Sequence, residues 1–318
     1  MKDEPEVKVG VDLAGLKLAT PMLVASGTYG WGTEFGEIEG FSGAAIGAMV
    51  LKGTTLEPRQ GNRTPRIVET AGGAGILNAI GLQNPGVEYV INHYLPRLKD
   101  AKAKVIANVA GATVEEYGKV TERLAGHERI DAVEVNVSCP NVKRGGMHFG
   151  ADAKVCAKVV RRCRKGTTKP LIVKLSPNVT DVRAIARAAV EAGADILTVA
   201  NTVLGTAIDI HTRKPILGSV SGGLSGPAIK PIALQKVLEV ADLVRDEGLD
   251  TPIIASGGIM TAEDALEFMI AGARAFAIGT VLFADFNAPE RIMEEMKKLL
   301  VELELADVNE IVGTLERQ

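Results

Sequence analysis

Short apolar runs alternate along this chain with segments whose apolar residues recur at helical spacing. Eight of the runs have the length and the branched side chains of buried strands. They are Pro21–Ala25, Ala45–Leu51, Val105–Val109, Val133–Ser138, Leu171–Leu175, Ile196–Ala200, Pro252–Ala255 and Ala275–Ile278. We expect helices at Val87–Leu98, Thr113–Ala125, Ala151–Arg164, Thr180–Ala192, Pro231–Asp246, Thr261–Ala271 and Ala288–Leu300. This alternation predicts an α/β fold, a (β/α)8 TIM barrel, with an open doubly wound sheet as the alternative.

Two segments depart from the simple alternation. Val7–Thr20 alternates about a turn at Ala14-Gly15, which predicts an N-terminal β-hairpin that closes the bottom of the barrel. Gly205–Gly226 is a long excursion after the sixth strand, and we expect a loop at the catalytic face. Hydroxyl residues with early acids indicate helix starts at Ser176–Asp181 and Met260–Asp264. No linker interrupts the pattern, so residues 1–318 are expected to form a single domain.

Composition excludes several classes of function. The chain has 318 residues and a net charge of -3, whereas a nucleic-acid partner calls for clustered basic residues. No apolar run reaches the roughly 18 residues that span a membrane, and the acidic N-terminus is unlike a secretory signal. Cys139, Cys156 and Cys163 form no metal or iron–sulfur ligand set with the four histidines. These features predict a cytoplasmic protein without a metal, a nucleic-acid partner or a membrane contact.

The ends of the predicted strands are unusually polar. Active sites of such barrels lie at the carboxyl ends of the strands, so these residues are expected to surround one ligand. They are Ser26, Gly27, Lys52, Gly53, Asn108, Asn136, Ser138, Cys139, Lys174, Asn201, Thr202, Ser256, Gly257, Gly258, Gly279 and Thr280.

Cys139 ends one of these strands, between the carboxamides of Asn136 and Asn141. A thiol in that setting suits proton transfer beside a polar, planar substrate. The alternative is a small apolar cysteine that completes a core strand.

Lys52 and Lys174 end apolar strands, where an ammonium group needs a partner. Either could neutralise an anionic ligand or a reduced flavin, and the alternative is a structural ion pair with a carboxylate such as Glu134.

Glycines at the last two strand ends suggest a phosphate site. Gly257-Gly258 and Gly279-Thr280 follow consecutive strands, and Ser221–Gly226 precedes a helix. Glycines let backbone N–H groups approach a phosphate, although tight turns without a ligand have the same composition. Asn78–Gly86 is expected to be a loop that binds a planar polar ring or simply turns into the next helix.

Taken together, these motifs resemble the FMN-containing catalytic subunits of class 1 dihydroorotate dehydrogenases, and among them the NAD-linked 1B subtype. The resemblance spans essentially the whole chain, and Asn141–Gly150 favours the 1B subtype. It rests on Lys52–Thr55, Asn78–Pro85, Asn136–Asn141, Val173–Pro177, Asn201-Thr202, Gly222–Gly226 and the two later glycine pairs.

The resemblance implies oxidation of (S)-dihydroorotate to orotate in de novo pyrimidine biosynthesis. It implies that Cys139 removes the C5 proton while a hydride passes from C6 to N5 of FMN. The implied substrate-binding residues are Lys52, Asn78, Ala79, Ile80, Gly81, Leu82, Asn136, Asn201 and Thr202. The implied FMN-binding residues are Ser26, Lys52, Gly53, Asn108, Asn136, Lys174, Ala200, Gly226, Gly257, Gly258, Gly279 and Thr280.

The same resemblance implies partners. A separate subunit with FAD and an iron–sulfur cluster would pass electrons to NAD, in a heterotetramer built around a homodimer of this chain. Three alternatives stay open: a fumarate-linked class 1A-like enzyme, a dihydropyrimidine dehydrogenase-like flavin subunit, and a non-redox phosphate-binding barrel that acts as a lyase or isomerase.

Overall fold

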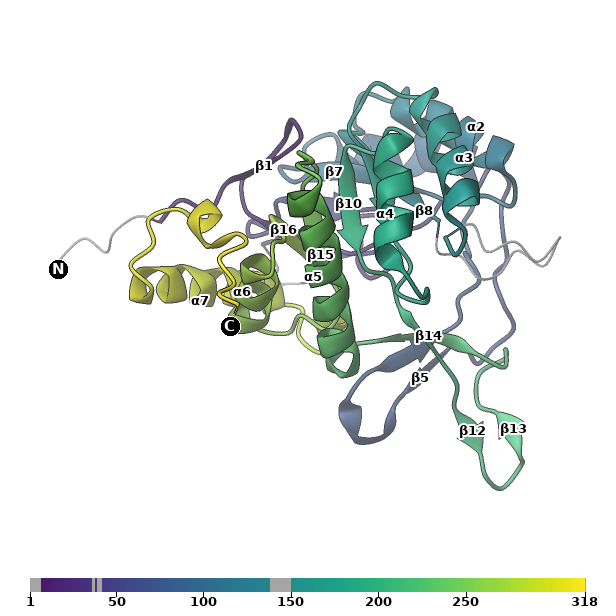
Figure 1. Cartoon of the computed structure of the whole chain (residues 1–318). Helices are drawn as coiled ribbons and strands as arrows, with labels where there is room; N and C mark the ends of the chain where they lie inside the picture. Colours follow the sequence, from purple (N-terminus) through teal and green to yellow (C-terminus); the bar gives the residue numbers. More distant parts are fainter. Residues whose placement is uncertain (1–6, 36–37, 39–41, 138–149, 318) are drawn as a thin grey trace.

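The centre of the protein is a closed barrel of eight parallel strands, seen in a computed structural model that describes residues 7–35, 38, 42–137 and 150–317 (Figure 1). In ring order the strands are β3 (Met22–Val24), β4 (Ala48–Val50), β7 (Lys104–Val109), β8 (Ala132–Asn136), β9 (Leu171–Lys174), β10 (Ile196–Val199), β15 (Ile253–Ser256) and β16 (Ala275–Ile278). β16 pairs with β3, which closes the ring. Each of the eight predicted strands coincides with one of these, so the predicted TIM barrel is confirmed and the open sheet is wrong.

Helices follow the strands and lie outside the barrel (Figure 1). They are α2 (Val114–Ala125), α3 (Ala153–Arg164), α4 (Val182–Glu191), α5 (Lys230–Asp246), α6 (Ala262–Ile270) and α7 (Ala288–Glu302), with 3₁₀ turns η2 (Ala71–Gly73), η5 (Pro227–Ile229), η6 (Thr280–Phe283) and η7 (Val308–Ile311). Thr261 and Asp264 form the expected capping box at the start of α6. The prediction that a hydroxyl caps α4 is wrong. The N-cap is Asp181, whose carboxylate accepts from the backbone N–H groups of Arg183 and Ala184.

The predicted helix at Val87–Leu98 is not a uniform α-helix. It comprises α1 (Val87–Tyr89), a π-helical turn η3 (Val90–Tyr94) and a 3₁₀ turn η4 (Leu95–Leu98). Pro96 has no amide hydrogen to donate, so a regular α-helical ladder cannot continue through it.

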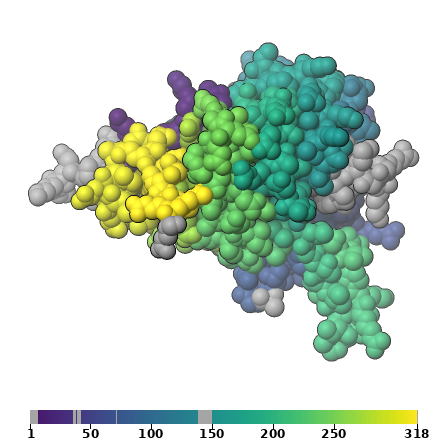
Figure 2. Space-filling view, in the orientation of Figure 1, coloured from purple at the N-terminus to yellow at the C-terminus, as the bar shows by residue number. Residues whose placement is uncertain are grey.

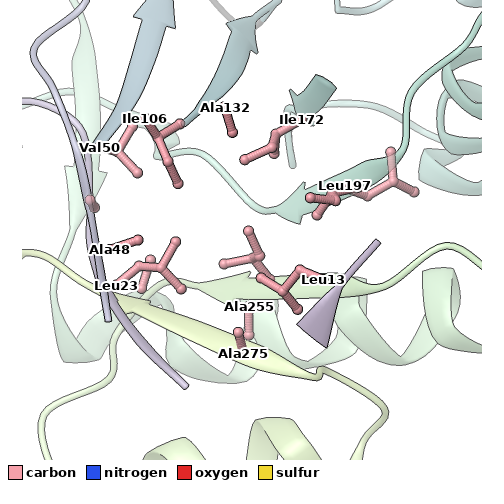
Figure 3. Close-up of a cluster of buried hydrophobic side chains, with 14 of the residues drawn as sticks. Leu13, Leu23, Ala48, Val50, Ile106, Ala132, Ile172, Leu197, Ala255 and Ala275 are labelled. Carbon is pink, nitrogen blue, oxygen red and sulfur yellow. The ribbon is translucent and has the colours of Figure 1, made fainter. Parts of the chain in front are cut away.

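The N-terminal hairpin lies where it was expected. β1 (Val11–Leu13) pairs antiparallel with β2 (Leu16–Leu18), and Ala14 and Gly15 turn the chain with positive φ angles of 50° and 88°. Leu13 is fully buried and points into the apolar interior of the barrel (Figure 3). Arg274, just before β16, donates to the backbone oxygen of Asp12 over 3.4 Å, so the hairpin closes the amino-terminal end of the barrel.

The excursion after the sixth barrel strand is more ordered than the expected loop. β11 (Val203–Gly205), β14 (Gly222–Ser225), β6 (Ile76–Asn78) and β5 (Ile67–Glu69) form an antiparallel sheet. Between β11 and β14 a hairpin of β12 (Ile208–Asp209) and β13 (Lys214–Pro215) projects from the body of the molecule (Figures 1 and 2). β14 was missed because two of its four residues are glycines, which carry no strand signal and permit close backbone approach.

The barrel interior is apolar toward the amino ends of the strands. Leu23, Ile106, Ile172 and Leu197 meet there with several alanines (Figure 3). Such packing excludes water and gives the barrel its stability. Among the described helices, none is long and apolar enough to cross a membrane.

Candidate functional site

Buried polar side chains gather above this apolar core, at the carboxyl ends of the strands. Five of them lie within the last three residues of a barrel strand and are at most 7% exposed: Asn108, Glu134, Lys174, Thr198 and Ser256. Buried polar groups cost free energy unless they bind one another or a ligand. Because these five buried polar residues all lie near the carboxyl ends of their strands, this end of the barrel is the candidate site.

Two carboxamides meet across the site. Asn201 Nδ2 donates to Asn136 Oδ1 over 3.1 Å, and Asn201 Oδ1 accepts from the backbone N–H of Thr202 over 2.8 Å. The fully buried Tyr117 on α2 donates its hydroxyl to the Asn136 backbone oxygen over 2.8 Å. Tyr117 was not singled out from the sequence, because it resembles any apolar residue on the inner face of a helix.

The small sheet brings Asn78 to the same place. Asn78 Nδ2 donates to the backbone oxygen of Gly223 over 3.2 Å, and a Cβ on Gly223 would lie 2.1 Å from Thr202 Oγ1. Gly223 thus permits β14 to pass between Asn78 and Thr202. Asn78, predicted to start a loop, is the last residue of β6.

The segment after β6 is held by Asn84, which sequence reasoning did not single out. Its side chain accepts from the backbone N–H groups of Thr55 (3.2 Å) and Gly86 (2.9 Å) and donates to Thr55 Oγ1 and the Leu82 oxygen, both over 2.8 Å. An asparagine before a proline is a common turn residue, and that was the available signal. Asn84 thus ties Leu82 to Thr55, three residues after Lys52.

Leu82 also reaches the end of β4. A Cβ at Gly53 would lie 3.3 Å from the Leu82 side chain and 3.1 Å from Asn108 Oδ1. Lys52, beside Gly53, is half-buried, and burial lowers the pKa of its ammonium group. The Glu34 carboxylate opposes this shift and the Arg66 charge adds to it. Lys52 forms no ion pair within the described part of the chain.

Three glycine turns lie close to one another at this end of the barrel. Gly226 precedes η5, and a Cβ there would lie 3.4 Å from the Thr280 methyl carbon. A Cβ on Gly258 would lie 2.8 Å from the backbone nitrogen of Lys230, at the start of α5. Gly279 is the N-cap of η6, close to Ala25 at the end of β3. A helix start and glycine backbone at one place suit an anion.

Asn108 leaves one polar atom unsatisfied. Its Nδ2 donates to Glu134 Oε1 over 2.7 Å, while its Oδ1 is buried and has no hydrogen-bond partner in the described part of the chain. A buried acceptor of this kind is normally satisfied by a ligand or by water. The site therefore fits a ligand that presents a donor next to Gly53.

Other predicted site residues also lie at the carboxyl ends of the barrel strands. Ser26 Oγ donates to the Leu51 oxygen over 2.8 Å, and the backbone N–H of Ala200 donates to the Ser256 oxygen over 2.9 Å. Lys174 lies at the end of β9, in register with Asn136. Glu134, considered as a lysine partner, accepts hydrogen bonds from Asn108 and Thr198.

Cys139 and Ser138 lie outside the described residues. β8 ends at Asn136, which is three residues before Cys139 in the sequence.

Comparisons with known proteins agree on one family. The family model described as dihydroorotate dehydrogenase matches residues 8–300. The catalytic subunit of dihydroorotate dehydrogenase B (NAD(+)) from Citrifermentans bemidjiense is 51% identical over 98% of this chain and 99% of its own length. The proteins of the same name from Desulforamulus reducens and Geobacter sulfurreducens are both 50% identical, over 97% of this chain and 98% of theirs.

Proposed function

Because this chain belongs to the dihydroorotate dehydrogenase family, we propose that it oxidises (S)-dihydroorotate to orotate in pyrimidine biosynthesis. The observation that carries the proposal is a continuous set of contacts between the predicted substrate residues. It runs from Asn136 to Asn201 and Thr202, and through Gly223 to Asn78. These residues offer amide donors and acceptors together, which suits the urea-like edge of a dihydropyrimidine ring.

We propose that residues 1–318 form a single domain and that this domain binds FMN as its cofactor. The chemistry that FMN supplies when bound is the acceptance of a hydride from C6 of dihydroorotate. The converging glycine turns fit its phosphate, and the unsatisfied Asn108 Oδ1 fits a donor on its ring. The residues proposed to hold it are Ser26, Lys52, Gly53, Asn108, Asn136, Lys174, Ala200, Gly226, Gly257, Gly258, Gly279 and Thr280.

The protein's own groups then have distinct tasks. We propose that Cys139 is the base that takes the proton from C5, since a thiol with a pKa of about 8.5 is a usable base near neutral pH. The Lys52 ammonium would neutralise the substrate carboxylate. Asn78, Asn136 and Asn201 would orient the ring, and the backbone from Ala79 to Leu82 would border it.

The electron acceptor is proposed from the names of the relatives, which specify NAD(+) and a catalytic subunit. This chain has no dinucleotide-binding GxGxxG motif in strand–helix context and too few cysteines for an iron–sulfur cluster of its own. We therefore propose a cytoplasmic heterotetramer, with a homodimer of this chain at its core and a partner subunit that carries FAD and the cluster.

An anaerobic absorption spectrum tests the function. Purified protein with bound FMN is mixed with dihydroorotate, and dihydrouracil serves as the control because it lacks the carboxylate. Bleaching of the flavin band by dihydroorotate alone is the expected result. Bleaching by dihydrouracil would indicate another pyrimidine substrate, and a protein that takes up no FMN would overturn the redox proposal.

A further inference from the structure

Glu134 is a buried carboxylate that the proposed chemistry does not use. It is 2% exposed, on β8 inside the barrel. Its Oε1 accepts from Asn108 Nδ2 over 2.7 Å, and its Oε2 accepts from Thr198 Oγ1 over 2.9 Å. Asn108 and Thr198 are each 1% exposed and come from β7 and β10. The carboxylate is therefore held at both oxygens by two other strands.

This arrangement fixes which way the Asn108 amide faces. A carboxylate carries no hydrogen, so a reversed amide would place Asn108 Oδ1 and Glu134 Oε1, two acceptors, 2.7 Å apart. The hydrogen-bond network thus assigns the amide orientation. Nδ2 must face Glu134, and Oδ1 must face the side of Gly53, where it is buried and has no partner among the described residues.

A carbonyl oxygen only accepts, so a ligand that satisfies Asn108 must present a donor. The ring system of oxidised FMN carries a single N–H, the imide at N3. We propose that Glu134 is a positioning residue that, together with Thr198, holds Asn108 as a fixed acceptor for this imide N–H. The inference rests on the proposed binding of FMN. It adds that the protein selects a flavin ring with an unsubstituted imide, through a residue that does not itself touch the ring.

Binding to the apoprotein tests this without any turnover. Dissociation constants for FMN and for N3-methyl-FMN are measured by quenching of flavin fluorescence, in the wild type and in variants. The wild type is expected to prefer FMN by about tenfold or more, the effect of leaving one buried acceptor unpaired. In Glu134→Leu the Asn108 amide is free to reverse, and the preference should fall to about threefold or less.

Conservative variants separate orientation from packing. Glu134→Gln should keep most of the preference, because its amide oxygen can still accept from Asn108 while its NH₂ group donates to Thr198 Oγ1. Thr198→Val should reduce the preference, since it releases one side of the carboxylate. Thr121→Val is the matched control, because the Thr121 hydroxyl is also buried but bonds the Tyr117 backbone oxygen.

The outcomes distinguish the inference from the proposed function. A wild type that binds both flavins equally, or a folded Glu134→Leu protein that keeps the wild-type preference, would overturn the role of Glu134. If Glu134→Leu does not fold, by circular dichroism, an unchanged preference in Thr198→Val overturns it instead. A wild-type apoprotein that binds neither flavin contradicts the proposed function itself.

Discussion

Asn201 Nδ2 lies 3.1 Å from Asn136 Oδ1, although 65 residues separate the two in the chain. The bond links the carboxyl ends of β8 and β10, which lie on either side of β9 in the barrel. It also fixes the orientation of both amides, since the Asn201 oxygen is occupied by the Thr202 backbone N–H. The pair thus presents a defined pattern of polar groups at the candidate site.

Loss of one amide should weaken substrate recognition. We expect Asn201→Ala to lower kcat/KM for dihydroorotate by about 10- to 100-fold, because the substrate loses one proposed amide contact and Asn136 Oδ1 loses the bond from Asn201. FMN affinity should change by less than about threefold. Steady-state kinetics and flavin titration measure both quantities. Asn92→Ala, at an exposed position of η3, is the matched control and should leave kcat/KM unchanged.

Removal of the proposed base should slow one step only. Cys139→Ala is expected to slow flavin reduction by dihydroorotate by about 10²- to 10⁴-fold while FMN stays bound. Anaerobic stopped-flow absorbance measures this rate directly. Cys156→Ala is the control, since burial raises the pKa of the Cys156 thiol to about 12 and leaves it inert. Equal rates in wild type and Cys139→Ala would remove Cys139 from the mechanism.

The glycine turn at Gly258 should be needed for FMN. Its φ is 79°, and a Cβ would meet the backbone of Lys230 at 2.8 Å, so Gly258→Ala should displace the start of α5. We expect FMN to bind at least about tenfold more weakly, as lost hydrogen bonds to one anion imply. Gly313→Ala has a similar φ of 72° but open space around it. It should cost about 1 kcal/mol of stability and leave FMN binding intact.

Acid should reveal the contribution of Asp131, at the amino end of β8. Burial acts to raise the pKa of this carboxyl, but hydrogen bonds from the Val105 N–H and Lys104 and the charges of Lys104 and Arg129 outweigh it, so its pKa is lowered. A group with a lowered pKa contributes stability above its unfolded pKa of about 4 and loses it as the pH falls through the folded value.

Asp131→Asn therefore tests this effect by urea unfolding at several pH values. The variant should be about 1 to 2 kcal/mol less stable than the wild type at pH 6 to 8. The difference should shrink below about pH 4, where the wild-type carboxyl takes up its proton. A difference that stays constant down to pH 2.5 would contradict the prediction.

Local pattern was sufficient for the elements that are buried on both faces. The strands of the barrel read as continuous apolar runs because the interior covers one face and the helices cover the other. The start of α6 could also be predicted from local sequence, because its capping box needs only two residues three positions apart, Thr261 and Asp264. The small sheet of β5, β6, β11 and β14 could not be predicted from local pattern. Its strands are three or four residues long, and Gly222 and Gly223 have no side chains that could alternate.

Sequence pattern predicts the barrel, its order of strands and helices, and the polar residues at the carboxyl ends of its strands. Those features follow from the pattern of apolar and polar residues within each single segment of the chain. Only the folded chain shows that Asn84 bonds Thr55, that Gly258 faces the start of α5, and that Glu134 accepts from Asn108. Each of these is a contact between residues that are distant in the sequence and that the folding of the barrel brings together.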